Sequence, residues 1–144
     1  MHVLIVEDSD DDFEATLRAL DLDKVGGVKI SRSLGGQNAW ELLLAQSSND
    51  EQASDQNCQF VILDLNMPGL DGRGLLSKMK AHDRIKLIPV AVLSTSDDKS
   101  DVDACYRKGA NAFIRKPVNW EDFVKKMSSL KAFWFQQAEL PSWR

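Results

Sequence analysis

The sequence predicts an α/β fold in which five parallel strands form a doubly wound sheet, in the order 2-1-3-4-5, with five helices covering both faces. Two observations support this prediction. The first is a series of short apolar runs of strand length. The second is that longer segments alternate with these runs, and in them apolar residues recur every three or four positions, as in a helix. Because parallel strands are joined by a crossover, usually a helix, this alternation favours a parallel sheet. With 144 residues, the chain has the length of one domain.

The first strand is predicted over residues 3–6, a β-branched and apolar run that ends at Glu7 and Asp8. Ser9 is suited to cap the helix that follows. The acids at 10–12 fall in the first turn of that helix, where the helix dipole favours negative charge. We interpret these three acids as partners of the dipole and not as ligands.

The remaining elements repeat this alternation. A second strand is predicted over 28–30 and a second helix after Gly36. The stretch 46–59 is polar and lacks periodicity, so we expect an exposed loop there. An apolar run over 60–63 delivers Asp64 to the end of a third strand, directly before a Pro-Gly turn. The later elements are a helix over 71–82, a strand over 87–93, a helix from Asp97, a strand over 112–115 and a final helix with an apolar seam at Trp120, Phe123, Met127, Leu130 and Trp134.

Composition and charge exclude several classes of function. The 18 Lys and Arg residues against 22 Asp and Glu give a net charge of -4, without a basic run, so nucleic acid is not expected as a partner. The N-terminal apolar run is too short for a signal peptide or a membrane span. Cys58 and Cys105 fit neither a disulfide framework nor a metal site, so we expect a soluble protein of the reducing cytoplasm. His2 and His82 belong to no shared motif and are expected at the surface.

Polar side chains recur where the predicted strands end. They are Glu7 and Asp8 after the first strand, Asp64 at the end of the third, Ser94 at the end of the fourth and Lys116 after the fifth. In the order 2-1-3-4-5 the first and third strands are neighbours, so their carboxylates share one crevice. Close carboxylates repel one another unless their pKa values rise or a cation intervenes. Oxygen ligands without histidine or thiolate suit Mg²⁺, and together with a hydroxyl and an ammonium they favour phosphoryl transfer to an aspartate.

Four motifs between residues 1 and 130 resemble those of one family. They are Glu7-Asp8, Asp64-Leu-Asn-Met-Pro-Gly with Asp71-Gly72, Leu93-Ser94-Thr95 and Phe113-Ile-Arg-Lys116-Pro117. Together they resemble the receiver domain of two-component response regulators, a flavodoxin-like fold. Glu7 stands where the family more often has Asp, and Ser94 where it more often has Thr, and the family accepts both. The resemblance implies a signalling phosphoacceptor that catalyses only its own phosphotransfer and slow autodephosphorylation.

The resemblance also implies a role for each site residue. Asp64 is the implied phosphoacceptor, with Ser94 and Lys116 as partners of the phosphoryl oxygens and Phe113 as the switch aromatic. The implied Mg²⁺ ligands are Glu7 through water, Asp8, Asp64 and the backbone carbonyl of Asn66. Phosphorylation would then remodel the face formed by the fourth helix, the fifth strand and the fifth helix. We expect a stand-alone regulator with a histidine kinase as donor and a downstream protein as target.

Residues 131–144 are expected to form a C-terminal helix extension and tail that mediates dimerisation. The run Ala132-Phe-Trp-Phe-Gln-Gln-Ala-Glu-Leu-Pro141 resembles the tail of small response regulators that serve phytochrome-type histidine kinases. The tail carries more apolar surface than one small helix hides against its own sheet, which favours a homodimer. Its apolar residues are Phe133, Trp134, Phe135, Leu140 and Trp143. The alternative is that Trp134 belongs to the core and the others are scattered surface aromatics.

Two other functions compete with a phosphorylated receiver. A phosphohydrolase of the haloacid-dehalogenase type also uses a strand-end aspartate, a hydroxyl, a lysine and Mg²⁺. Its motif is Asp-x-Asp after the first strand, whereas here the third strand carries Asp64-Leu-Asn66. A receiver-like interaction module that works without phosphorylation usually lacks a key residue, whereas Asp8, Asp64 and Lys116 are all present.

Overall fold

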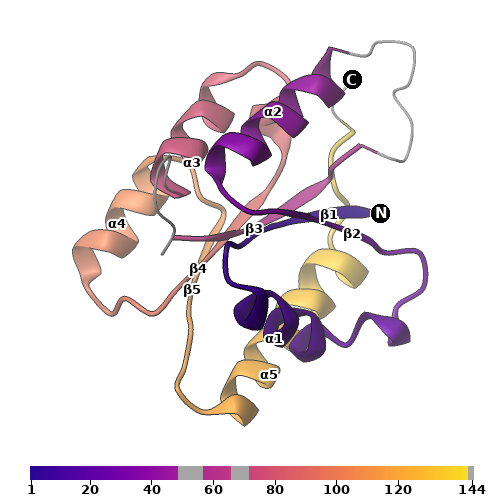
Figure 1. The fold of residues 1–144 in the computed structure, drawn as a ribbon, viewed down its shortest axis with the longest axis vertical. Coiled ribbons are helices and arrows are strands. Elements are labelled where there is room, and N and C mark those ends of the chain that lie inside the picture. The colour runs from indigo at the N-terminus through magenta and orange to yellow at the C-terminus, as the bar shows by residue number, and fades with distance from the viewer. Residues whose placement is uncertain (49–56, 66–71, 143–144) are drawn as a thin grey trace.

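The computed structural model describes residues 1–48, 57–65 and 72–142. Within these residues, five parallel strands form one sheet in the order β2-β1-β3-β4-β5, which confirms the predicted topology (Figure 1). The strands are β1 (His2–Val6), β2 (Lys29–Ser33), β3 (Phe60–Asp64), β4 (Val90–Ser94) and β5 (Ala112–Arg115). Because all of them run in the same direction, their carboxyl ends meet at one edge of the sheet.

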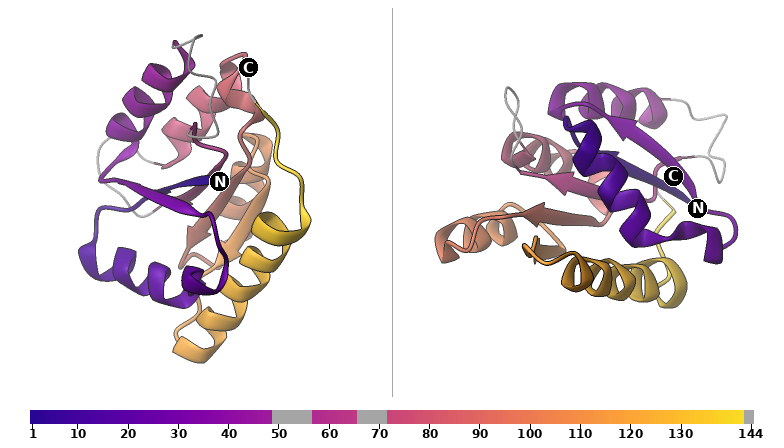
Figure 2. Two further views of the ribbon diagram at one scale, coloured as in Figure 1. Left: turned by 90° about the vertical axis from the view of Figure 1, so that its right-hand side faces the viewer. Right: turned by 60° about the horizontal axis from the view of Figure 1, so that its bottom comes forward.

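Helices cover both faces of this sheet. The α-helices are α1 (Asp10–Leu20), α2 (Gly36–Ser47), α3 (Gly72–Ala81), α4 (Lys99–Arg107) and α5 (Trp120–Leu130). Helices α1 and α5 lie together on one face, and α2, α3 and α4 cover the other (Figure 1 and Figure 2). Shorter helical segments are η1 (Leu22–Lys24), η3 (Ile85–Leu87) and η4 (Lys131–Gln137), a π-helix that continues α5. Among the described residues, no helix combines the length and apolarity that a membrane span requires.

The core lies in two layers, because consecutive residues of a buried strand point to opposite faces of the sheet. In β1, Val3 and Ile5 pack with residues of α1 and α5, whereas Leu4 and Val6 pack with residues of α2 and α3. Strands β1, β3 and β4 are buried along their whole length. Packing on both faces therefore fixes the carboxyl ends of the three central strands.

Two elements start later than predicted. Residues 85–87 form η3 and not the start of a strand, and Pro89, which has no N–H to donate to a neighbouring strand, lies directly before β4. Helix α4 begins at Lys99, because the Asp98 side chain caps it and accepts a hydrogen bond from the Ser100 N–H at 2.9 Å.

The prediction that His2 lies at the surface is wrong. The residue is only 3% exposed, and its Nε2 lies 2.7 Å from the Ser31 hydroxyl oxygen on β2. Strands β2 and β3 flank β1 on either side, and the sequence around His2 contains no local pattern that predicts the burial of its imidazole. His82 is half-buried, and its Nδ1 accepts hydrogen bonds from the backbone N–H groups of Arg84 and Ile85, both at 3.2 Å.

The stretch 46–59, predicted as a loop, contributes its first two residues to α2. After the end of α2, residues 49–56 lie outside the described part of the chain. The Gln46 side chain accepts a hydrogen bond from the Cys58 N–H at 2.9 Å, and Cys58 is fully buried. The two ends of the stretch are therefore held together beside β3.

Three apolar side chains of the described tail pack against the core. The rings of Trp134 and Phe135 lie with centroids 5.2 Å and 5.4 Å from that of Phe60 on β3, and Leu140 packs against the same cluster. Among the aromatic residues of the described tail, Phe133 is the exception, with 56% of its surface exposed. Figure 2 shows η4 continuing the axis of α5 along the sheet. The alternative that only Trp134 belongs to the core is therefore wrong, since Phe135 and Leu140 pack there too, and the expected dimerisation through the tail stays a prediction. Trp143 lies outside the described residues.

Candidate functional site

Two carboxyl groups lie at the carboxyl ends of the neighbouring strands β1 and β3. Asp64 is the last residue of β3 and is 5% exposed, and Glu7 directly follows β1 and is 2% exposed. The β1–β3 pairing matches Val6 with Leu63, so the next residues on each strand, Glu7 and Asp64, lie side by side. The Glu7 N–H donates to the Ser33 carbonyl on β2 at 2.9 Å, which holds its backbone in line with the sheet. The local sequence thus places two acids in a site almost closed to water.

Lys116 brings a positive charge between these acids. Its Nζ lies 3.4 Å from Asp64 Oδ2 and 3.7 Å from Glu7 Oε1. The Lys116 N–H donates to the Ser94 carbonyl at 2.7 Å, which extends the β4–β5 pairing by one residue and aims the lysine across β4 toward β3. One ammonium therefore serves two buried carboxyl groups, and this leaves an excess of acidic groups.

Glu7 carries most of the resulting electrostatic cost. Burial, together with the hydrogen bond and negative charge of Asp64, raises the pKa of Glu7 to about 8, although the charge of Lys116 opposes the shift. Glu7 Oε2 is buried and has no hydrogen-bond partner among the described residues. A site with a proton retained on one acid and an orphaned oxygen is suited to accept a cation, which would displace that proton.

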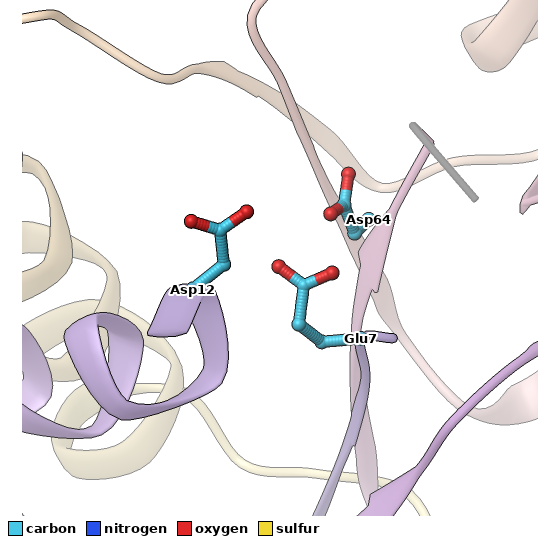
Figure 3. A group of neighbouring side chains, drawn as sticks. All are labelled: Glu7, Asp12 and Asp64. Atoms are coloured by element: carbon cyan, nitrogen blue, oxygen red, sulfur yellow. The ribbon is translucent and has the colours of Figure 1, made fainter. Parts of the chain in front are cut away.

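A third carboxyl group comes from α1. Oxygen atoms of Glu7, Asp12 and Asp64 all lie within 4.8 Å of one another. In Figure 3 the Glu7 carboxyl group lies between those of Asp12 and Asp64. Sequence reasoning missed Asp12, because three consecutive acids in a first helical turn give no sign of which one turns toward the sheet. The cap that Ser9 provides by accepting a hydrogen bond from the Asp12 N–H at 3.2 Å fixes that turn.

Of the other residues predicted for the site, those that the structure describes lie outside the group formed by Glu7, Asp12 and Asp64. Ser94 is 1% exposed, and its hydroxyl oxygen accepts a hydrogen bond from the Ser96 N–H at 3.1 Å. Phe113 is half-buried on β5, and its N–H donates to the Tyr106 hydroxyl at 3.1 Å. Asp8 is exposed and does not belong to the group of three carboxylates. Asn66 lies outside the described residues, so its predicted carbonyl ligand stays a prediction.

The donor set fits a hard divalent cation. Glu7, Asp12 and Asp64 offer only carboxylate oxygens, and Lys116 offsets only part of their charge. When bound, such an ion supplies positive charge that stabilises oxygens carrying negative charge. The same set, with its lysine and its neighbouring hydroxyl, suits transfer of a phosphoryl group to Asp64.

The family model of the response regulator receiver domain matches residues 3–128 of this chain. Among individual proteins, the response regulator Rcp1 of Synechocystis sp. is 32% identical over 140 residues, which cover 97% of this chain and 92% of Rcp1. The two-component response regulator ARR15 of Arabidopsis thaliana is 31% identical over 131 residues, which cover 90% of this chain and 62% of ARR15. The chain thus spans nearly all of Rcp1 but less than two thirds of ARR15.

Solved structures agree with this grouping. The phosphorylated cyanobacterial phytochrome response regulator RcpA has a TM-score of 0.83 at 30% identity, with 98% of both chains covered. The Mn²⁺-bound form of Rcp1 has a TM-score of 0.82 at 31% identity, with 97% of this chain and 98% of Rcp1 covered.

The relatives are regulators, so the comparisons do not favour the haloacid-dehalogenase alternative. Receiver domains bind a divalent metal and interact with histidine kinases. On the match over residues 3–128, the shared fold and the acidic site at the carboxyl ends of β1 and β3, the chain belongs to the response regulator receiver domain family, whose members are signalling phosphoacceptors.

Proposed function

We propose that Asp64 accepts a phosphoryl group from a histidine kinase and that the protein signals through the protein contacts this change alters. The observation that carries the proposal is the surroundings of Asp64. It is 5% exposed, it ends a central strand, and Lys116 Nζ lies 3.4 Å from its Oδ2. A carboxyl group held beside an ammonium at the mouth of the sheet is suited to act as a nucleophile, because its position is fixed and a positive charge lies next to it.

The transfer requires one bond to form and one to break. An Asp64 oxygen attacks the phosphorus of a phosphohistidine, the P–N bond breaks, and the leaving imidazole keeps the electron pair and takes up a proton. Lys116 offsets the charge of the phosphoryl oxygens, and the Ser94 hydroxyl, after turning from the Ser96 N–H, donates to one of them. Mg²⁺ is the proposed ion, bound by Glu7 through water, Asp8, Asp64 and the Asn66 carbonyl, because hard oxygen ligands suit it.

The signal is proposed to reach the surface through Phe113. Ser94 lies on β4 and Phe113 on the adjacent β5, where its N–H is held by the Tyr106 hydroxyl of α4. Phe113 also borders a groove of ≈ 730 Å³ whose apolar lining includes Leu130 and Phe133. A rotation of Phe113 after Ser94 moves would change this groove and so alter the surface offered to a downstream protein.

The test is the intact mass of the protein after incubation with Mg²⁺ and acetyl phosphate. The native protein is expected to gain one phosphoryl group, and Asp64→Asn to gain none. Asp83→Asn, which removes a fully exposed acid far from the site, is the matched control and should be modified like the native protein. A phosphoryl group that persists in Asp64→Asn would refute the assignment.

The proposed donor is a phytochrome-type histidine kinase in the cytoplasm. The support is the similarity to Rcp1 and to RcpA, which is a phytochrome response regulator. Both cysteines, Cys58 and Cys105, are free thiols, as a reducing compartment would keep them. Phosphotransfer from a phytochrome-type kinase that is much faster than from an unrelated histidine kinase would support this donor. Equal rates would contradict it.

The proposed homodimer involves the segment 131–144 beyond the receiver domain of residues 1–130. Its support is Phe133, whose exposed ring borders the groove that Leu130 and Trp134 also line. Deleting the tail would also remove Trp134 and Phe135 from the core, so Phe133→Ser is the sharper test. We expect this variant to be monomeric by light scattering at a concentration where the native protein is dimeric. The same mass for both would refute the role of Phe133.

A further inference from the structure

We propose that Asp12 is a further carboxylate ligand of the divalent-cation site, beside Glu7, Asp8 and Asp64, either directly or through one water molecule. The inference deepens the proposed function and rests on it. It differs from the sequence-based interpretation, in which Asp12 only complements the dipole of α1, and it assigns to the first turn of α1 a part in the chemistry of β1 and β3.

The first support is distance. Oxygens of Asp12, Glu7 and Asp64 lie within 4.8 Å of one another. Two ligands on opposite sides of an ion with bonds of about 2.1 Å are themselves about 4.2 Å apart. The three carboxyl groups therefore need only small side-chain rotations to bind one ion, and a bridging water would span the remaining gap.

The second support is the orphaned oxygen of Glu7. Glu7 is 2% exposed, and its Oε2 has no hydrogen-bond partner among the residues that the structure describes. Figure 3 shows the Glu7 carboxyl group directed into the space between Asp12 and Asp64. A buried acceptor aimed at two further carboxylates is costly unless something positive lies between them. A cation bound in this space would therefore lie next to the carboxyl group of Asp12.

The third support is the contrast among the three acids of this turn. Asp10 forms an ion pair with Arg32 at 2.7 Å, and Asp11 is exposed and outside the group of three. Asp12 alone of the three borders the cavity of ≈ 300 Å³ that Lys116 and Thr95 also line. Glu7 and Asp64 do not line this cavity, so its contribution is to place Asp12 beside Lys116, whose Nζ contacts both of them. All three acids are exposed, so they differ in their neighbours and not in their burial: only Asp12 has carboxyl oxygens of Glu7 and Asp64 close to it.

The test is isothermal titration of Mn²⁺ and of Mg²⁺ into the unphosphorylated protein and its variants. Asp12→Asn is expected to weaken the affinity about tenfold. Asp11→Asn is the matched control, because it removes the same charge from the same helical turn. At low salt we expect it to weaken binding less than about twofold, through long-range attraction alone.

Repeating the titrations in about 1 M KCl separates a ligand from a distant charge, because the Debye length there is about 3 Å. The effect of Asp11→Asn should disappear, whereas that of Asp12→Asn should persist. Equal effects of the two substitutions, or loss of the Asp12→Asn effect at high salt, would overturn the inference. Asp12→Ser, which also removes the carboxylate and which the first turn of a helix tolerates, repeats the measurement if Asp12→Asn unfolds.

The same experiment separates this inference from the proposed function. If Asp64→Asn loses the ion but Asp12→Asn binds it like the native protein, only the role of Asp12 fails. If Asp64→Asn binds the ion as well as the native protein does, the site itself fails and the proposed function with it.

Discussion

The two ends of the same parallel sheet differ in how far their polar groups are hydrogen-bonded. At the amino end, His2 Nε2 lies 2.7 Å from the Ser31 hydroxyl, and the N–H of the buried Val90 donates to the side chain of the exposed Asn111 at 2.9 Å. Lys80 Nζ donates to the Ile88 carbonyl at 3.0 Å there. At the carboxyl end, Glu7 Oε2 has no partner among the described residues, and Lys116 pairs with only two of the three clustered carboxyl groups, those of Glu7 and Asp64.

This difference separates stability from chemistry. A satisfied buried polar group adds modestly to stability, whereas an unsatisfied one, or an uncompensated group of like charges, costs free energy. The amino end therefore stabilises the fold, and the carboxyl end retains an electrostatic deficit that a cation or a phosphoryl transfer relieves. Such trade-offs between stability and function are expected where a site needs groups that do not favour one another.

The largest expected effect comes from removing the deficit at the carboxyl end. The pKa of Glu7 is 4.5 when unperturbed and about 8 in the folded protein. Below pH 4.5 the group is protonated in both states and costs nothing. As pH rises toward 8, only the unfolded state releases the proton, so stability falls, and above pH 8 the full cost applies. Glu7→Gln, which cannot ionise, should therefore be more stable at pH 9 by about 2–4 kcal/mol.

Urea unfolding in EDTA at pH 4 and pH 9 measures this gain. The two proteins should match at pH 4 and diverge at pH 9. Glu14→Gln, which removes an exposed acid of α1, is the control and should show no such divergence. A Glu7→Gln variant that is less stable than the native protein at pH 9 would show that the carboxyl end carries no deficit.

The next effect has the opposite sign and belongs to the amino end. His2→Ala should lower the free energy of unfolding by about 2 kcal/mol, because it empties a buried site and leaves the Ser31 hydroxyl without its imidazole partner. Urea midpoints for His2→Ala, Ser31→Ala and the double variant form a cycle, in which a coupling of about 1 kcal/mol isolates the hydrogen bond. A coupling near zero would mean that this polar pair adds nothing, and the contrast between the two ends would weaken.

The smallest expected effect concerns the access of a reagent to the Cys58 thiol. Cys58, next to the amino end of β3, is fully buried, and burial raises the pKa of its thiol to about 12. Iodoacetamide at pH 8 should therefore leave Cys58 unmodified in the native protein, since thiolate is the reactive form. Peptide mass analysis should find the adduct only after denaturation, and Cys105, also fully buried, serves as the internal comparison. Rapid native labelling of Cys58 would show that the amino end opens readily.

Local pattern was enough to predict most of the strands and the residues at their ends. Runs such as 3–6 and 60–63 are apolar throughout, as strands buried on both faces are, and the residue after such a run in a parallel sheet lies at the functional edge. The same reasoning failed at 87–89, because a proline before a strand is compatible with either a strand start or a preceding turn.

The sequence by itself thus predicted the sheet order and the approach of Glu7, Asp64 and Lys116, since alternating strands and helices indicate a doubly wound parallel sheet, whose strand ends meet at one edge. Only the tertiary structure decided that Asp12 joins them, that the His2 imidazole is buried against Ser31 and that the tail packs on Phe60. Each of these contacts depends on which side chains meet across residues far apart in the chain. Periodicity along one segment shows which face of a helix is apolar. It does not show which residues of another element that face will contact.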